Sequence, residues 1–178
     1  MLEIQVEGVE TFNEATNEFL TVKTQTLKLE HSLVSISKWE SKWKKPFINQ
    51  KEKTSEEIID YIRCMTINQV NPIVYSILSQ KNIDDIVAYI DDPMTATTVN
   101  NIPGKKTNEA ITSELIYYWM VSYEIPFECE KWHLNRLLAL IKICNVKNQP
   151  NKKMSRRQVF EQNKALNAAR RARLHTKG

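Results

Sequence analysis

A chain of 178 residues with 42% apolar side chains has the usual size of one globular domain and can bury a sizeable core. Its three glycines argue against loop-rich β architectures and against a glycine-rich phosphate-binding loop, so helices are favoured. The net charge of +4 is uneven, because residues 147–178 hold ten Lys and Arg and one acidic residue, Glu161, which leaves residues 1–146 at −5. Such a basic extension usually contacts nucleic acid, an acidic protein surface, or only water.

No stretch of the chain is expected to lie in a membrane. The longest uncharged apolar run, residues 115–123, is far too short to span a bilayer, and the first residues do not resemble a signal peptide. The three cysteines, Cys64, Cys129 and Cys144, are odd in number and widely spaced, so they predict neither a disulfide framework nor a CxxC metal site. We therefore expect a soluble intracellular protein with buried, apolar cysteines.

Residues 1–30 are expected to form a β-hairpin or small meander that packs on the rest of the protein. Apolar and polar residues alternate in this region, which is the pattern of half-buried strands. The apolar positions are Leu2, Ile4, Val6, Leu20, Val22, Leu27 and Leu29. The segment 12–19 is expected to be the turn between two of the strands.

Residues 31–146 are expected to form a helical body. A short helix entered through Ser32 should continue to Pro46, and Thr54 should cap a helix over residues 55–65. The second helix is expected to bury Ile58, Ile59, Ile62 and Met65. A further segment starts at Pro72, and Asn82 is expected to cap a helix that ends before Pro93.

The second half of the body contains one irregular segment and two further helices. Residues 94–106 are rich in Thr, Asn, Pro and Gly, which indicates a binding or mobile loop. Residues 107–123 predict a helix that is apolar on most of its circumference and should lie at the centre of a bundle. A helix from about Glu128 to Cys144 should pair with it as a helical hairpin.

Residues 147–178 are expected to form a basic C-terminal helix or tail. Ser155 and Gln158 have the spacing of a capping box, and Val159, Phe160 and Leu166 can dock one end of the helix. The cationic candidates for partner binding are five arginines: Arg156, Arg157, Arg170, Arg171 and Arg173. If they neutralise phosphates, the binding will depend strongly on salt.

The sequence offers no catalytic constellation, so we expect no enzyme activity, cofactor or metal. Cys129 and His133 are four residues apart and supply only half of a zinc site if they share a helix face. Glu128 and Glu130 should raise the pKa of the Cys129 thiol, which works against a reactive thiolate. The acidic pairs at 84–85 and 91–92 are interpreted as solvated helix positions, because adjacent residues point apart on a helix.

Two tryptophans, Trp39 and Trp43, lie four positions apart among several lysines. Aromatic side chains with interleaved cations can form a base-stacking platform. An amphipathic helix whose aromatic stripe enters the core gives the same pattern, and this interpretation is favoured. An exposed protein-binding stripe stays open, because aromatic residues dominate interface anchors.

Several strings of the sequence resemble small proteins of tailed bacteriophages that are interpreted as tail assembly chaperones. The resemblance covers nearly the whole chain and ends on a basic Ala-Arg-Arg segment at 169–171. The strings are Leu29-Glu30-His31-Ser32-Leu33, Ser37-Lys38-Trp39-Glu40-Ser41-Lys42-Trp43, Pro46-Phe47, Asp60-Tyr61-Ile62-Arg63-Cys64-Met65, Asp92-Pro93-Met94-Thr95-Ala96-Thr97 and Ile125-Pro126-Phe127-Glu128-Cys129 to Leu137.

The resemblance implies a non-enzymatic, mainly helical protein of the host cytoplasm. Such a chaperone coats the long tape measure protein and keeps its apolar surface soluble until tail tube subunits polymerise around it. The role also implies a homo-oligomer. In this role Trp39, Trp43 and the segment 94–106 can supply apolar contacts, and the basic arginines can reach acidic faces of the tape measure or tail tube protein.

Two other classes of function fit the same sequence. A virion structural protein, such as a connector or tail component, would have a similar composition. A nucleic-acid-binding module would use the basic C-terminus, and its affinity would fall steeply with salt.

Overall fold

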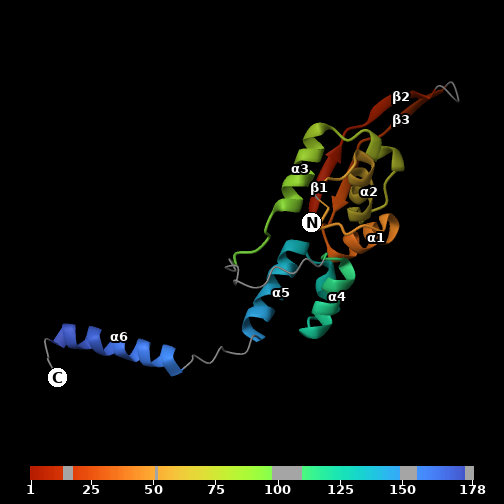
Figure 1. The fold of residues 1–178 in the computed structure, drawn as a ribbon. Coiled ribbons are helices and arrows are strands. Elements are labelled where there is room, and N and C mark those ends of the chain that lie inside the picture. The colour runs from red at the N-terminus through yellow and green to blue at the C-terminus, as the bar shows by residue number, and fades with distance from the viewer. Residues whose placement is uncertain (14–17, 51, 98–109, 149–155, 175–178) are drawn as a thin grey trace. The chain divides into compact units, whose positions relative to one another are not determined.

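The computed structural model describes residues 1–13, 18–50, 52–97, 110–148 and 156–174. The chain divides into two compact units, Met1–Lys147 and Asn148–Gly178 (Figure 1). The predicted boundary after Val146 lies one residue before this division. The fold is mainly helical with a small antiparallel sheet region at the N-terminus, which confirms the expected fold class.

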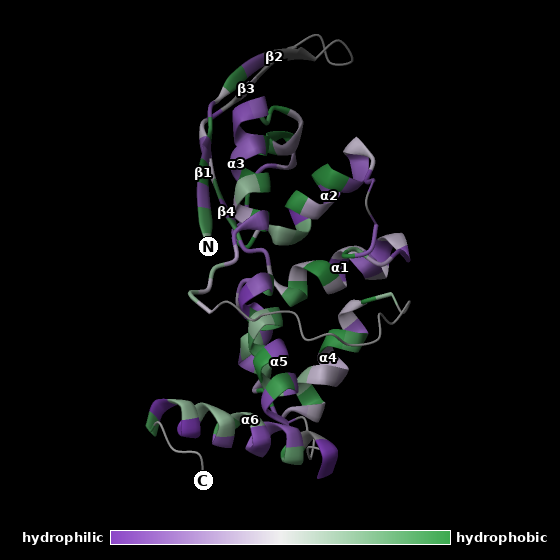
Figure 2. Cartoon of the chain, turned by 60° about the vertical axis from the view of Figure 1, so that its left-hand side comes forward, coloured by the Kyte–Doolittle hydropathy of each residue, from purple (hydrophilic) through white to green (hydrophobic). Residues whose placement is uncertain are grey.

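Four short strands form the N-terminal part of the first unit. They are β1 (Leu2–Val6), β2 (Val9–Asn13), β3 (Glu18–Val22) and β4 (Gln25–Leu29). β1 pairs antiparallel with β4 and β2 with β3, so the expected hairpin is present as two ladders. Alternate residues of β1 and β4 face the core. The hydropathy colours of β1 alternate along the strand in the same way (Figure 2). The turn expected over 12–19 is too long, because both middle strands extend into it; residues 14–17 lie outside the described residues.

The first two helices begin where their capping residues predict. In α1 (Leu33–Trp43) the Ser32 hydroxyl accepts a hydrogen bond from the Ser35 N–H, and in α2 (Ser55–Met65) Thr54 accepts one from the Glu57 N–H. Ile62 and Met65 are buried as expected. Burial of Ile58 was a wrong prediction, because this side chain is 39% exposed. The inward face of α2 instead includes two carboxylates, Glu57 and Asp60.

A 3₁₀-helix, η1 (Pro72–Ser76), leads into α3 (Gln80–Asp91). The prediction that Asn82 caps this helix was wrong, because Ser79 is the capping residue. Asn82 is the third helical residue, and its side chain accepts a hydrogen bond from the Ser79 N–H while the Ser79 hydroxyl accepts one from the Asn82 N–H. This reciprocal capping box explains why both residue types stand at the helix start. The helix ends before Pro93, as predicted.

The next helix, α4 (Ser113–Ser122), is shorter and less buried than expected. Thr112 caps it, and residues 110–112 are not helical; residues 98–109 lie outside the described residues. Burial on most of its surface was a wrong prediction, since Tyr118 is 65% and Val121 is 61% exposed. α4 and α5 lie at the end of the first unit away from β2 and β3 (Figure 1).

The helix expected from Glu128 starts later. Residues Phe127–Lys131 form a 3₁₀-helix, η2, and α5 spans Leu134–Asn148. Between them, His133 forms a β-bridge with Ser32, and the Leu134 N–H donates a hydrogen bond of 2.7 Å to the His31 carbonyl. These contacts with the segment before α1 hold the chain extended, so the helix cannot begin before Leu134.

The second unit contains α6 (Arg156–Leu174). Val159, Phe160 and Leu166 are exposed, and the proposed cap residue Ser155 lies outside the described residues. Within the ranges that the structure describes, no helix is long and apolar enough to cross a membrane.

Candidate functional site

The tryptophan pair of α1 belongs mainly to the core. Trp39 is 0% exposed and donates its indole N–H to the Glu57 carbonyl at 3.0 Å, which confirms the core interpretation for this residue. Trp43 is half-buried, stacks on Trp39 with ring centroids 6.1 Å apart, and donates its indole N–H to Asp60 at 2.9 Å. Trp39 therefore has no surface to offer a partner in this conformation, and Trp43 has only part of its ring.

Two of the lysines around Trp43 are paired with buried carboxylates. Lys42 lies 2.5 Å from Asp60, and Lys45 lies 2.6 Å from Glu57. Both ammonium groups lie 5.8 Å from the centre of the Trp43 ring. These cations are engaged within the fold, which weakens the case for a base-stacking platform with free positive charges.

The carboxylates of α2 are held in their charged form by these contacts. Hydrogen bonds from Lys45 and from the Thr54 N–H lower the pKa of Glu57. Burial alone raises the pKa of Asp60, but hydrogen bonds from Lys42 and Trp43 reverse the shift and leave the pKa lowered. Sequence reasoning missed both residues; the available signal is their position three residues apart on the inward face of α2. They bind α1 to α2 rather than forming an open site.

A second buried polar cluster joins the start of α1 to the start of α5. His31 shares a hydrogen bond of 2.5 Å with Tyr61, and its ring lies 5.0 Å from the ring of His133. The Nε2 atom of His133 donates to the Tyr89 carbonyl at 3.0 Å, while Nδ1 accepts from the Asn135 N–H at 3.3 Å. Both ring nitrogens of His133 are therefore occupied.

The contacts of His133 argue against the zinc half-site of Cys129 and His133. Cys129 lies in η2 and His133 precedes α5, so the two do not share one helix face. Among the described residues, no three His, Cys, Asp or Glu side chains gather in a way that could hold a metal ion. Burial raises the pKa of the Cys129 thiol, and Glu128 adds to the shift. The predicted direction and the role of Glu128 are confirmed, but Glu130 does not contribute to the shift and burial is the largest cause.

The surface of the first unit has an apolar groove between α2 and α3. It has a volume of about 540 Å³, and its aliphatic lining consists of Ile58, Ile62, Ile83, Ile86, Val87 and Ile90. Ile58 and Val87 are the most exposed of these, and Val87 is 49% exposed. Glu52, Lys53 and Asp91 supply charged groups in the lining. We call this the apolar groove.

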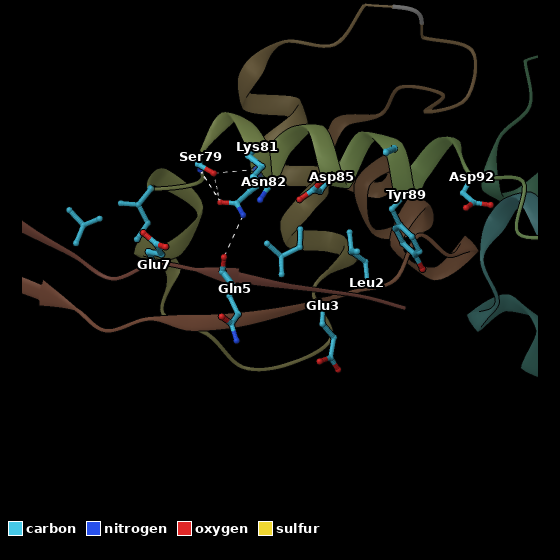
Figure 3. A pocket seen from close by; sticks show the side chains of 14 residues that line it. Leu2, Glu3, Gln5, Glu7, Ser79, Lys81, Asn82, Asp85, Tyr89 and Asp92 are labelled. Atoms are coloured by element: carbon cyan, nitrogen blue, oxygen red, sulfur yellow. Dashed lines mark hydrogen bonds between the residues drawn. The ribbon is translucent and has the colours of Figure 1, made fainter.

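A larger groove of about 850 Å³ lies between β1 and the opposite side of α3 (Figure 3). Its lining combines apolar side chains, such as Leu2 and Ile77, with polar ones, and its charged groups are mainly acidic: Glu3, Glu7, Asp85 and Asp92 against one cation, Lys81. Asn82 reaches across from α3 and donates a long hydrogen bond, 3.4 Å, to the Gln5 carbonyl. We call this the edge groove.

The candidate arginines Arg156, Arg157, Arg170, Arg171 and Arg173 all lie on α6 in the second unit. The described side chains of this helix are exposed, and Arg157 forms an ion pair of 3.4 Å with Glu161. The arginines and the two tryptophans thus belong to different units.

Comparison of the chain with protein-family models, with curated proteins and with solved structures found no match.

Proposed function

We propose that this protein is a non-enzymatic tail assembly chaperone of a tailed bacteriophage that binds the tape measure protein and keeps it soluble in the host cytoplasm. The resemblance of the sequence strings supports the class of protein. The observation that carries the binding role is the apolar groove between α2 and α3. A groove of this kind matches the apolar stripe of a helical partner.

The spacing of the groove residues suits a helix as the bound element. Ile83, Val87 and Ile90 recur at steps of four and three along α3, so they form one stripe, and Ile58 of α2 lies opposite. A long helical protein presents many such stripes, and several copies of the chaperone can bind along it. We infer that the active form is an array of copies on one tape measure protein.

The resembling strings build the framework behind this groove. Trp39 contacts Phe47 with ring centroids 5.1 Å apart, and Phe47 contacts Tyr61 at 4.0 Å. Tyr61 continues the chain of rings to His31 and His133. The groove residues Ile58 and Val87 lie outside the strings, whereas Phe47, Tyr61 and Ile62, which also line the groove, lie within them. The resemblance therefore covers the scaffold and part of the groove, and the choice of partner rests on the groove.

The test is co-expression with the long tape-measure-like protein of the source genome, followed by pull-down and light scattering. We expect a soluble complex with many copies of this chain per partner. Val87→Asp should abolish the complex, because it places a carboxylate in the apolar groove. Val121→Asp is the matched control, since Val121 is exposed on α4 and does not line the groove.

Two outcomes contradict the proposal in different ways. If both Asp variants retain the complex, the apolar groove is not the binding surface. If no complex forms and the tape measure protein stays insoluble, the chaperone role itself is wrong. The protein should then be sought by mass spectrometry in purified particles, as a connector or tail component.

The exposed arginines of α6 favour nucleic-acid binding as a second candidate function. This function predicts binding of a duplex oligonucleotide at low salt, with log K falling by about 0.9 per phosphate contact for each decade of salt. Replacing the α6 arginines with glutamine should then abolish the binding. A tape measure complex that forms equally well with these variants would separate the two functions.

A further inference from the structure

The outer edge of β1 differs from the outer edge of β4. The segment after α2 covers β4, because the Ile67 N–H donates to the Lys28 carbonyl at 3.0 Å and the Asn68 side chain bonds both Lys28 and Thr26. In the part of the chain that the structure describes, the outer edge of β1 receives one hydrogen bond, the long contact from Asn82 to the Gln5 carbonyl. β1 is therefore a nearly open strand edge.

The pairing register identifies the free backbone groups. In an antiparallel ladder, residues alternate between those bonded to the neighbouring strand and those whose N–H and C=O point away from it. Gln5 points away from β4, since its carbonyl accepts from Asn82, and Glu3 has the same orientation two residues earlier. Their partners Thr26 and Lys28 likewise bond outward to Asn68. The edge thus presents the N–H groups of Glu3 and Gln5 and the Glu3 carbonyl.

The side chains of β1 define what a neighbouring strand should carry. Ile4 and Val6 face the core, while Glu3, Gln5 and Glu7 are exposed on the other face. The existing neighbour β4 already shows the matching pattern, because Leu27 and Leu29 face inward and Lys28 forms an ion pair of 3.1 Å with Glu3. A strand added to the outer edge of β1 would likewise have apolar side chains toward the core and a side chain next to Glu3 on the exposed face.

Charge selects among the strands that this edge can accept. Four carboxylates, those of Glu3, Glu7, Asp85 and Asp92, line the edge groove, and Lys81 is the single cation in its lining. Pairing of two β1 edges from two copies would bring acidic side chains together, so the charges act against self-association. They favour a strand with basic side chains.

We propose that the edge groove binds an extended segment of a partner polypeptide that carries Lys or Arg at alternate positions and adds a strand to β1. The backbone of the segment bonds Glu3 and Gln5 and replaces the long Asn82 contact. Its basic side chains lie beside Glu3 and Glu7, and its apolar side chains face the groove below α3 (Figure 3).

This inference is independent of the chaperone proposal, because the two grooves use opposite sides of α3. Asn82, Asp85 and Tyr89 line the edge groove, whereas Ile83, Val87 and Ile90 line the apolar groove. One helix therefore separates a surface suited to a helical partner from a surface suited to an extended one. Val87→Asp should leave binding at the edge groove unchanged, so failure of one proposal does not imply failure of the other.

The probe is a synthetic peptide of alternating valine and lysine, added to the full-length, isotope-labelled protein at low salt. We expect the amide hydrogens of Glu3 and Gln5 to exchange more slowly in the complex, because new hydrogen bonds protect them. The same peptide with glutamate in place of lysine should not bind. Absence of binding at about 1 mM basic peptide, or binding without protection of these amides, overturns the proposal.

Two variants separate strand addition from charge attraction. Gln5→Pro removes an N–H that β4 does not use, so the fold should persist and peptide affinity should fall by about tenfold. Glu7→Gln combined with Asp85→Asn should weaken binding several-fold and reduce its salt dependence. Glu128→Gln, which removes one exposed charge outside the groove, is the control and should bind like the wild type. If Gln5→Pro binds the basic peptide as tightly as the wild type does, strand addition is wrong. Exchange of the Glu3 and Gln5 amide hydrogens in the wild-type protein tests strand addition without any variant.

Discussion

The Glu40 carboxylate accepts a hydrogen bond of 2.7 Å from the backbone N–H of Ser113, which stands 73 positions later and begins α4. Its other oxygen accepts from the Phe47 N–H, also at 2.7 Å. Glu40 is buried, and it thereby joins α1 to the segment after it and to the start of α4. The first N–H groups of a helix have no acceptor within the helix. The Glu40 carboxylate supplies the acceptor for the Ser113 N–H, and its negative charge is favourable at the N-terminus of α4.

Replacing Glu40 by glutamine should lower the free energy of unfolding by about 2 kcal/mol, because one accepting oxygen becomes an NH₂ group and a buried N–H loses its partner. Urea denaturation measures the change. Glu128→Gln, at an exposed position, should change the free energy by less than about 0.5 kcal/mol. Equal effects of the two variants would show that the contact between Glu40 and Ser113 contributes nothing to stability.

The two tryptophans of α1 should differ in their contribution to stability. Trp39→Ala should cost about 3–5 kcal/mol, because it opens a cavity in the core and removes the indole N–H that bonds the Glu57 carbonyl. Trp43→Ala should cost less, since this ring is partly exposed. Thermal or urea unfolding of the two variants decides the order. A larger loss for Trp43 would mean that its contacts with Lys42, Lys45 and Asp60 outweigh the burial of Trp39.

The buried histidines should make the protein less stable in mild acid. Burial, and then the proximity of His133, lower the pKa of His31 from 6.5 to about 3. Between these values the unfolded chain binds a proton that the folded chain does not, so stability is fully present above about pH 6.5 and is lost as the pH falls toward 3. The pKa of His133 is also lowered, mainly by burial, and acts in the same direction.

Unfolding measured at pH 7 and at pH 5 tests this expectation, because carboxylates with lowered pKa contribute mainly at lower pH. His31 alone should reduce the free energy of unfolding by about 2 kcal/mol over this interval. His31→Gln should remove more than half of the pH dependence, whatever its effect on stability at pH 7. An unchanged dependence in this variant would assign the acid sensitivity to another group.

The parts of the fold that the sequence predicts are those with local causes. Ser32 and Thr54 lie next to the helices that they cap, and the alternation of Leu27 and Leu29 is set by the pleat of one strand. The start of α5 was predicted wrongly because it depends on the His31 carbonyl, which is far away in the sequence. The exposure of Tyr118 and Val121 on α4 was also not predictable, because both residues are apolar or aromatic and the sequence of the helix does not show that it lies at the edge of the unit.

The surfaces proposed to bind partners were not predictable for the same reason. The edge groove requires Gln5 and Asn82 to meet across 77 positions, and the apolar groove requires Ile58 and Val87 to face each other from two helices. In contrast, burial of Trp39 follows from its place in the apolar stripe of one helix. The spacing of Cys129 and His133 suggested a shared helix face, but the interruption before α5 removes it.

Truncation after Asn148 should leave the first unit as stable as it is in the whole chain. Among the described residues, the hydrophobic core and the apolar residues packed against it lie between Leu2 and Cys144, so the truncation removes none of these side chains. The free energy of unfolding should change by less than about 0.5 kcal/mol. The shortened chain has 16 Lys and Arg against 20 Asp and Glu, a net charge of −4, so any binding of an oligonucleotide should disappear. Urea denaturation and fluorescence anisotropy measure the two effects. A loss of more than about 1 kcal/mol would mean that residues 149–178 stabilise the first unit, and retained oligonucleotide binding would place that activity outside the basic extension.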